Sequence, residues 1–173
     1  MTLNNQSDIS RGIIVLSLQA AFYVLVLPFV FLFIGDYIDT QYFLLISYPS
    51  WIKLSIAIIC TPIGMVFLPW AIFSLYKIEE RAAASSPINP TFMVIGAYKL
   101  CRNPITFGAL FYFVGLGALL GSLTTIIVSL LSTLIFGCLY AKMLTEKSFE
   151  RKFKSAYRSY KETTPFLIPK LKK

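Results

Sequence analysis

Three long stretches without a single charged residue constrain what this chain can fold into. They run over residues 12–35, 54–76 and 105–141. A helix that spans a membrane needs about 20 mainly apolar residues, so each of the first two stretches predicts one span. The third would form a helix of roughly 55 Å, far longer than a hydrocarbon core of about 30 Å. It must therefore fold back, and Gly121-Ser122 is the predicted turn.

Composition also favours a membrane protein. The chain is 57% hydrophobic and only 14% charged, with a mean hydropathy of +0.71. A soluble domain carries about 25% charged residues. We therefore expect one all-α integral membrane domain over residues 1–173. Its four transmembrane helices should lie at about residues 12–35, 54–76, 105–120 and 123–141, with a tight hairpin formed by the last two and an amphipathic cytoplasmic helix after them.

Basic residues predict the orientation, because Lys and Arg collect on the cytoplasmic side. The connection at residues 36–53 contains one cation, Lys53, and two acids, Asp36 and Asp39. Four cations precede the hairpin in the predicted loop at residues 77–104, and ten of the sixteen basic residues follow Ala141. We therefore expect both termini and loop 77–104 in the cytoplasm, in a bacterial inner membrane or the endoplasmic reticulum.

The net charge of +8 comes mostly from the basic tail. Nucleic-acid binding is one interpretation of such a tail, but a basic helix beside a span more often contacts anionic lipid headgroups, and we expect membrane lipids and no nucleic acid as partners. The chain has no histidine, which excludes His-based metal sites and imidazole catalysis. Its three cysteines have neither disulfide nor metal-site spacing, so no metal is expected.

Two charged features flank the predicted hairpin. Arg102 lies just before it, and an Arg beside bilayer-depth sequence is expensive unless it has a partner. After the hairpin in the sequence, residues 145–161 contain no helix breaker and carry apolar residues at helical spacing. Glu146 lies within about 20° of Phe153 on this helix, so an acid sits on the face that should be buried. The alternative interpretation is that Glu146 lies near the helix N-terminus only because its negative charge interacts favourably with the helix dipole.

The C-terminal half resembles a known family on three features. The first is Gly96-x-Tyr98-x-x-x-Arg102-x-Pro104-x-x-x-Gly108, and the second is the two-span hairpin. The third is Glu146-x-x-Phe149-x-x-x-Phe153-x-x-x-Tyr157-x-x-Tyr160 with a Pro-x-x-x-Pro ending. Residues 87–169 in this order are similar to the isoprenylcysteine carboxyl methyltransferases, which belong to a wider group of membrane methyltransferases that includes phospholipid methyltransferases.

The chain departs from that family at four positions. Asn103 stands where the family usually has His, Thr106 where it has Tyr, Thr145 where it has the first of two acids, and Lys154 where it has a small Gly. Asn at the first of these positions is similar to the phospholipid methyltransferase version.

The resemblance implies an S-adenosylmethionine site built from residues 87–108 and 142–169. Arg102 would bind the cofactor carboxylate as a bidentate fork, and Glu146 would pair with its ammonium, so these two are the expected catalytic residues. Tyr98 or Tyr157 would face the sulfonium or the adenine ring. The other expected cofactor-binding residues are Asn103, Pro104 and Gly108.

The resulting prediction is a methyltransferase that acts on a lipophilic or prenylated substrate at the membrane. The absence of histidine slightly favours a carboxylate as the methyl acceptor, because a carboxylate is already ionised near pH 7. A glutamate or tyrosine could still accept a proton from an amine or thiol acceptor. Three alternatives remain open: a phospholipid amine N-methyltransferase, an NADPH-dependent membrane reductase and an inactive membrane scaffold.

Overall fold

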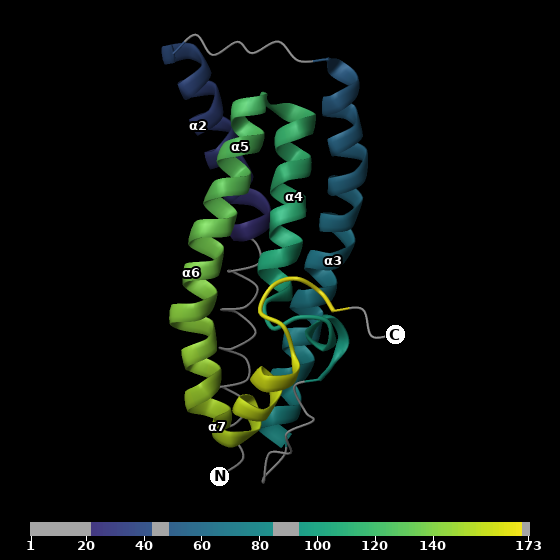
Figure 1. Cartoon of the computed structure of the whole chain (residues 1–173), viewed down its shortest axis with the longest axis vertical. Helices are drawn as coiled ribbons and strands as arrows, with labels where there is room; N and C mark the ends of the chain where they lie inside the picture. The colour runs from purple at the N-terminus through teal and green to yellow at the C-terminus, as the bar shows by residue number, and fades with distance from the viewer. Residues whose placement is uncertain (1–21, 43–48, 85–93, 171–173) are drawn as a thin grey trace, which may run out of the picture.

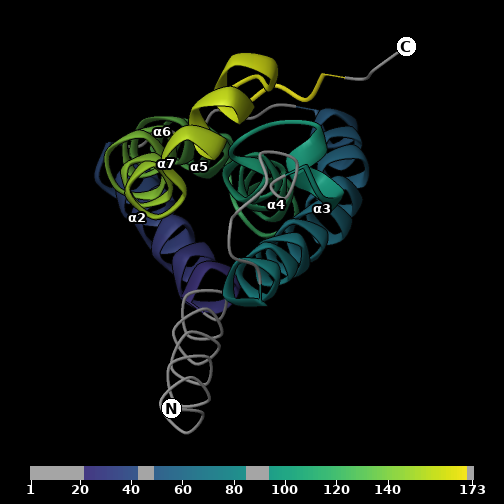
Figure 2. The ribbon, with the colours of Figure 1, turned by 90° about the horizontal axis from the view of Figure 1, so that it is seen from below.

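The computed structural model describes residues 22–42, 49–84 and 94–170, and these residues are 88% helical with no strand among them. The expected all-α class is confirmed for this part of the chain. The helix α4 (Pro104–Leu120) lies between α3 (Ser50–Ala84) and α5 (Leu123–Ser132), as Figures 1 and 2 show. The helix α2 (Leu27–Tyr42) follows a π-helical turn, Phe22–Val26, and packs against α5.

Two helical runs, residues 50–81 and 123–163, are long and apolar enough to cross a membrane by length and composition. The α4 helix is also apolar but shorter. Large apolar side chains are exposed on several helices, among them Phe33 on α2 and Val66 on α3, which are 73% and 71% exposed. Soluble monomers rarely expose large continuous apolar patches. These features suggest a membrane location.

The α3 helix is longer than the predicted span at both ends. It begins at Ser50, in the expected connector, and continues to Ala84, so residues 77–84 are not part of a loop as predicted. The reason is local, since no Pro or Gly occurs between Pro69 and Pro87. The α2 helix likewise passes the expected end at Gly35 and reaches Tyr42. Residues 12–21 of the first predicted span and residues 87–93 of the predicted cofactor-site segment lie outside the described residues.

Glycines allow α3 and α4 to pack with their backbones in close approach. A Cβ on Gly108 would lie 2.8 Å from the Leu68 backbone nitrogen, closer than real Cβ contacts allow. The same holds at other levels of the interface, where Gly64 opposes Tyr112 and Gly115 opposes Thr61. Small residues are the usual means by which apolar helices approach closely. This contact fixes the start of α4, and with it the segment that carries Arg102.

The predicted turn between α4 and α5 is confirmed. Gly121 ends α4 in an extended conformation, and Ser122 begins α5 as its N-cap. The Ser122 hydroxyl accepts a hydrogen bond from the Thr125 backbone N–H at 3.2 Å, and the Thr125 hydroxyl accepts one from the Ser122 backbone N–H at 3.4 Å. This reciprocal capping satisfies two of the N–H groups that a helix start leaves unpaired.

The last span and the basic tail form one helical run, which corrects the prediction of two separate helices. After α5 the run continues through Thr133–Gly137, α6 (Cys138–Tyr140) and Ala141–Thr145 into α7 (Glu146–Thr163). No Pro or Gly occurs between Gly137 and Pro165, so nothing in the sequence ends the helix. The run instead bends inside α7, at Lys154, whose φ is 46° and ψ is −118°.

Candidate functional site

The segment between α3 and α4 is held against α3 by a glycine. Gly96 has a φ of 51°, in the region that favours glycine, and a Cβ there would lie 2.1 Å from the Ser74 Oγ. That hydroxyl accepts a hydrogen bond from the Ala97 backbone N–H at 3.1 Å. The short 3₁₀ helix Gly96–Lys99 that follows buries Tyr98. The anchored segment then presents Arg102 and Asn103 directly before α4.

The end of the chain lies along this segment and holds it from the other side. We call residues 164–170 the C-terminal strap. The backbone N–H groups of Arg102 and Asn103 donate to the carbonyls of Pro165 and Phe166 at 2.8 and 3.1 Å. The Asn103 side-chain amide also donates to the Phe166 carbonyl, at 3.1 Å. Two segments about 60 residues apart in sequence therefore form one unit, which fixes the position of Arg102.

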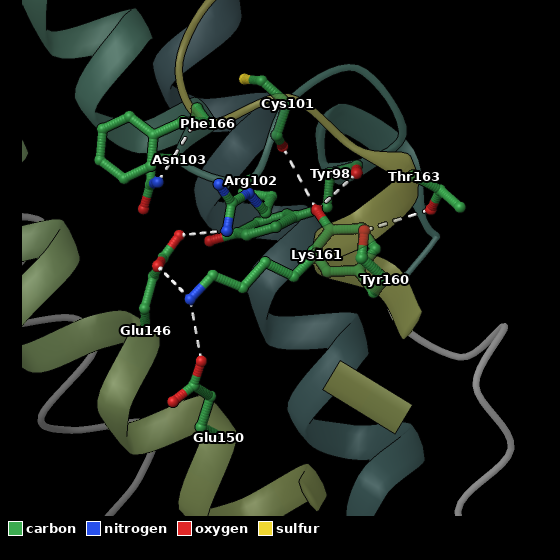
Figure 3. Close-up of polar contacts among 10 residues, drawn as sticks. All are labelled: Tyr98, Cys101, Arg102, Asn103, Glu146, Glu150, Tyr160, Lys161, Thr163 and Phe166. Carbon is green, nitrogen blue, oxygen red and sulfur yellow. Dashed lines mark hydrogen bonds and ion pairs between the residues drawn. The ribbon is translucent and has the colours of Figure 1, made fainter. Parts of the chain in front are cut away.

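The bend in α7 folds its second half back onto its first. Residues 150 and 161 of a straight helix would be about 16 Å apart, beyond the reach of one lysine side chain. In the structure the Lys161 Nζ lies 2.9 Å from the Glu150 Oε1 and 3.3 Å from the Glu146 Oε2 (Figure 3). The unusual backbone conformation at Lys154 makes this possible. The bend therefore brings a second cation to Glu146.

A cluster of buried aromatic side chains supports both halves of the site. It joins Tyr98 and Ile78 to four residues of α7, which are Phe149, Phe153, Tyr157 and Tyr160. The Tyr160 hydroxyl donates to the Tyr98 carbonyl at 2.7 Å and lies 3.4 Å from the Cys101 carbonyl (Figure 3). The apolar residues at helical spacing in the tail therefore pack on Tyr98, in the segment before α4, and on Ile78 of α3.

The centre of the site is an ion pair between Arg102 and Glu146. The Arg102 Nη1 and the Glu146 Oε1 are 2.8 Å apart, and the two side chains are 12% and 5% exposed. The N–H bond is not aligned with the oxygen, however. Among the described residues, the buried Nη1 and Nε of Arg102 and the Oε1 of Glu146 therefore have no hydrogen-bond partner. The Phe166 ring lies 5.5 Å from the guanidinium carbon.

Burial suppresses ionisation of the neighbouring hydroxyl and thiol groups. It raises the pKa of Tyr157, and the nearby Glu146 carboxylate raises it further while Arg102 opposes the rise. Burial likewise raises the pKa of Cys101 to about 11. Both groups are therefore neutral near pH 7, and neither serves there as an anionic nucleophile or a strong base.

A cavity of about 820 Å³ lies between α3 and the long helical run, and its wall includes Asn103 and Lys147, the sequence neighbours of Arg102 and Glu146. Volumes of about 300–1,000 Å³ are typical of small-molecule sites. Its wall combines apolar residues of α3, such as Leu68 and Ile72, with Tyr98 and Asn103. Its wall also contains an ion pair between Glu79 of α3 and Lys152 of α7. The arrangement can accept a ligand that has an apolar part and charged groups.

The structure brings most of the predicted site residues together. Arg102 and Glu146 form the ion pair, and Asn103 and Tyr98 line the neighbouring cavity. Tyr157 is buried among the aromatic residues. The remaining two predicted residues belong to α4: Pro104 is buried at its first turn, and Gly108 packs against α3 outside the cavity wall.

Sequence reasoning missed two residues that contact this pair. Lys161 binds Glu146, and Phe166 faces Arg102. A straight helix places residues 146 and 161 far apart, so helical spacing alone gave no reason to pair them. The one available signal was the resemblance, since its Gly corresponds to Lys154, where the helix bends.

Comparison with known proteins adds no relative. No protein-family model, curated protein or solved structure matches this chain. The functional argument therefore rests on the residues and their geometry.

Proposed function

We propose that this protein is an S-adenosylmethionine-dependent methyltransferase that acts on a lipophilic substrate at the membrane. One observation carries the proposal. Arg102 and Glu146 are buried together, yet two guanidinium nitrogens and one carboxylate oxygen lack hydrogen bonds among the described residues. Unsatisfied buried polar groups are costly and usually have a functional reason. A ligand with a carboxylate and an ammonium on one carbon supplies both of the missing partners.

The methionine end of the proposed cofactor has those two groups. Its carboxylate would accept from the free N–H groups of Arg102, and its ammonium would donate to the Glu146 Oε1. The other oxygen of Glu146 is already taken by Lys161, which balances the second positive charge. The bound cofactor would supply a methyl group on a positively charged sulfur. The chain's own residues would orient the reactants and exclude water from them, which is what such a transfer chiefly requires.

The adjoining cavity suits the rest of such a ligand and a lipophilic acceptor. Tyr98 offers an aromatic surface and Asn103 an amide in its wall, next to the apolar side chains of α3. We propose that the chain crosses the membrane four times, with the site at the cytoplasmic end. A lipid acceptor would then approach from the side. A carboxylate acceptor needs no added base, which agrees with the absence of histidine.

Equilibrium binding to the purified protein in detergent tests the proposal. We expect saturable binding of S-adenosylmethionine, with an affinity at least about 30-fold weaker after Arg102→Ala or Glu146→Ala, because truncating one partner of a buried charge pair costs about 2–5 kcal/mol. Arg158→Ala and Glu162→Ala are matched controls, since both residues are exposed on the same helix. Thermal unfolding of each variant verifies that it is folded.

Each alternative function gives a different result in this experiment. Binding of NADPH in place of S-adenosylmethionine would favour a reductase, and binding of neither would favour a scaffold. Wild-type affinity for S-adenosylmethionine in both site variants would show that the site assignment is wrong. Radiolabelled methyl transfer to a prenylcysteine analogue and to a whole lipid extract then separates a carboxyl acceptor from a phospholipid amine.

A further inference from the structure

A second feature of the long helical run is a stripe of five residues that changes from apolar to basic. It consists of Tyr140, Met143, Leu144, Lys147 and Arg151, and we call it the amphiphilic stripe. The spacings of three, four, seven and eleven residues place all five on one face of a helix. Glu146 lies on a different face, so the stripe is separate from the Arg102–Glu146 pair.

The amphiphilic stripe borders two cavities. All five residues line both the cavity of about 820 Å³ beside α3 and a second cavity of about 640 Å³. The second cavity is walled on its far side by Leu27 of α2 and Phe113 of α4. Tyr140, Met143 and Leu144 are 42%, 56% and 58% exposed, although each is a large apolar side chain. The stripe is therefore the shared wall of a space that runs along both sides of the helix.

The basic end of the stripe has unbalanced charge. Lys147 and Arg151 are both exposed, and neither forms an ion pair among the described residues. The second cavity has no acidic residue in its described wall. In the first cavity the one acid, Glu79, is paired with Lys152. Two neighbouring cations without an acidic partner attract an anion.

We propose that the amphiphilic stripe binds one anionic phospholipid. Its phosphate lies at Lys147 and Arg151, and an acyl chain follows Leu144, Met143 and Tyr140 towards the membrane interior. The stripe covers about 16 Å along the helix, enough to contact both a headgroup and the upper part of a chain. A small soluble anion would satisfy only the basic end and leave the apolar end uncovered. The proposal uses the membrane location put forward above but not the methyl transfer.

Lipid selectivity tests this site directly. The protein, purified in a mild detergent, is mixed with equal amounts of dioleoylphosphatidylglycerol and dioleoylphosphatidylcholine, and the retained lipid is counted by native mass spectrometry. We expect the wild type to retain the anionic lipid about 30-fold more, since each of the two cations near an anionic headgroup contributes about 1 kcal/mol. Lys147→Gln with Arg151→Gln should abolish this preference. Lys142→Gln with Arg158→Gln removes the same charge from exposed positions off the stripe and should keep it.

Two further measurements locate the lipid and separate this site from the methyl-donor site. A phosphatidylglycerol with a photoreactive group in its acyl chain should label the segment at residues 138–151. Arg102→Ala, a variant outside the stripe, should keep the wild-type preference for the anionic lipid. Equal retention of the two lipids by the wild type, or an unchanged preference in the stripe variant, would overturn the proposal. Displacement of the lipid by glycerol phosphate alone would also overturn it, because the apolar half of the stripe would then contribute nothing.

Discussion

At the scale of single residues, the buried pair of Arg102 and Glu146 is an expensive arrangement. Removing a charged group from water costs several kcal/mol, and an attraction without an aligned hydrogen bond recovers only part of that cost. Lys161 and the Phe166 ring provide further compensation, at 3.3 Å from the Glu146 Oε2 and 5.5 Å from the guanidinium carbon. Two apolar residues of similar volume at these positions would stabilise the fold at least as well, because they carry no desolvation cost. The charged pair therefore costs stability, which is the ground on which we propose a ligand site here.

The hydroxyl of Tyr160 gives a prediction for stability. It donates to the Tyr98 carbonyl in a buried site, so Tyr160→Phe leaves that acceptor without its partner. We expect the free energy of unfolding to fall by about 1–3 kcal/mol, with a Tm lower by several degrees. Thermal unfolding in detergent measures the change. Tyr37→Phe, at an exposed position on α2, is the control and should leave the Tm unchanged.

The Glu150–Lys161 contact predicts a dependence on pH. The hydrogen bond from Lys161 lowers the pKa of the Glu150 carboxyl below its ordinary value of 4.5. Such a group adds stability above its unfolded pKa, and the stability is lost as the pH falls through the folded pKa. We therefore expect Glu150→Gln to lower the Tm slightly at pH 7, with an effect that disappears as the pH decreases below 4.5. A difference that stayed constant across that range would contradict this origin.

At the scale of elements, the bend in α7 decides which residues meet. Lys154 has a φ of 46° and a ψ of −118°, a backbone conformation that residues other than glycine rarely adopt. The bend lets the second half of the helix cover the first and leads the chain into the C-terminal strap.

Replacing this residue should therefore stabilise the protein. In Lys154→Gly the strain is relieved, and we expect the free energy of unfolding to rise by about 1–2 kcal/mol. The neighbouring Ser155 has ordinary helical torsions, so Ser155→Gly should lower it by about 0.5–1 kcal/mol. Thermal unfolding of both variants distinguishes the outcomes. If Lys154→Gly destabilised the protein as much as Ser155→Gly does, the helix would be straight in solution.

At the scale of the whole molecule, α7 and the α4–α5 turn lie toward opposite ends of the long axis (Figure 1). The end of α2 lies near that turn, whereas α7 and the C-terminal strap surround the site. The exposed apolar helices between the two ends are the proposed membrane region. The two ends should therefore face opposite sides of the membrane, with the basic tail in the cytoplasm.

Cysteine labelling in sealed cells tests this orientation. Gln41→Cys and Ser159→Cys place single thiols at exposed positions near the two ends, in a variant whose three native cysteines are replaced by serine. A membrane-impermeant maleimide should label residue 41 in intact cells and residue 159 only after permeabilisation. Labelling of both positions from one side would exclude the four-span arrangement.

Sequence patterns predicted much of the fold because they act locally. The charge-free stretches indicated the apolar helices, and Gly121-Ser122 indicated the turn. Helical spacing placed Glu146 on the buried face of its helix. The same reasoning was wrong at Lys77, where the end of an apolar stretch is not the end of a helix. A charged helix of good propensity can simply continue beyond it, as α3 does to Ala84.

The helical class, the hairpin and the two charged clusters that flank it follow from the order of the amino acids, because hydrophobic periodicity and turn chemistry depend on near neighbours. The contact of Arg102 with Glu146, the addition of Lys161 and the support from the C-terminal strap become visible once the chain is folded. These contacts join residues 15 to about 60 positions apart. They depend on close packing at the α3–α4 glycines and on one backbone torsion at Lys154, which no periodic pattern encodes.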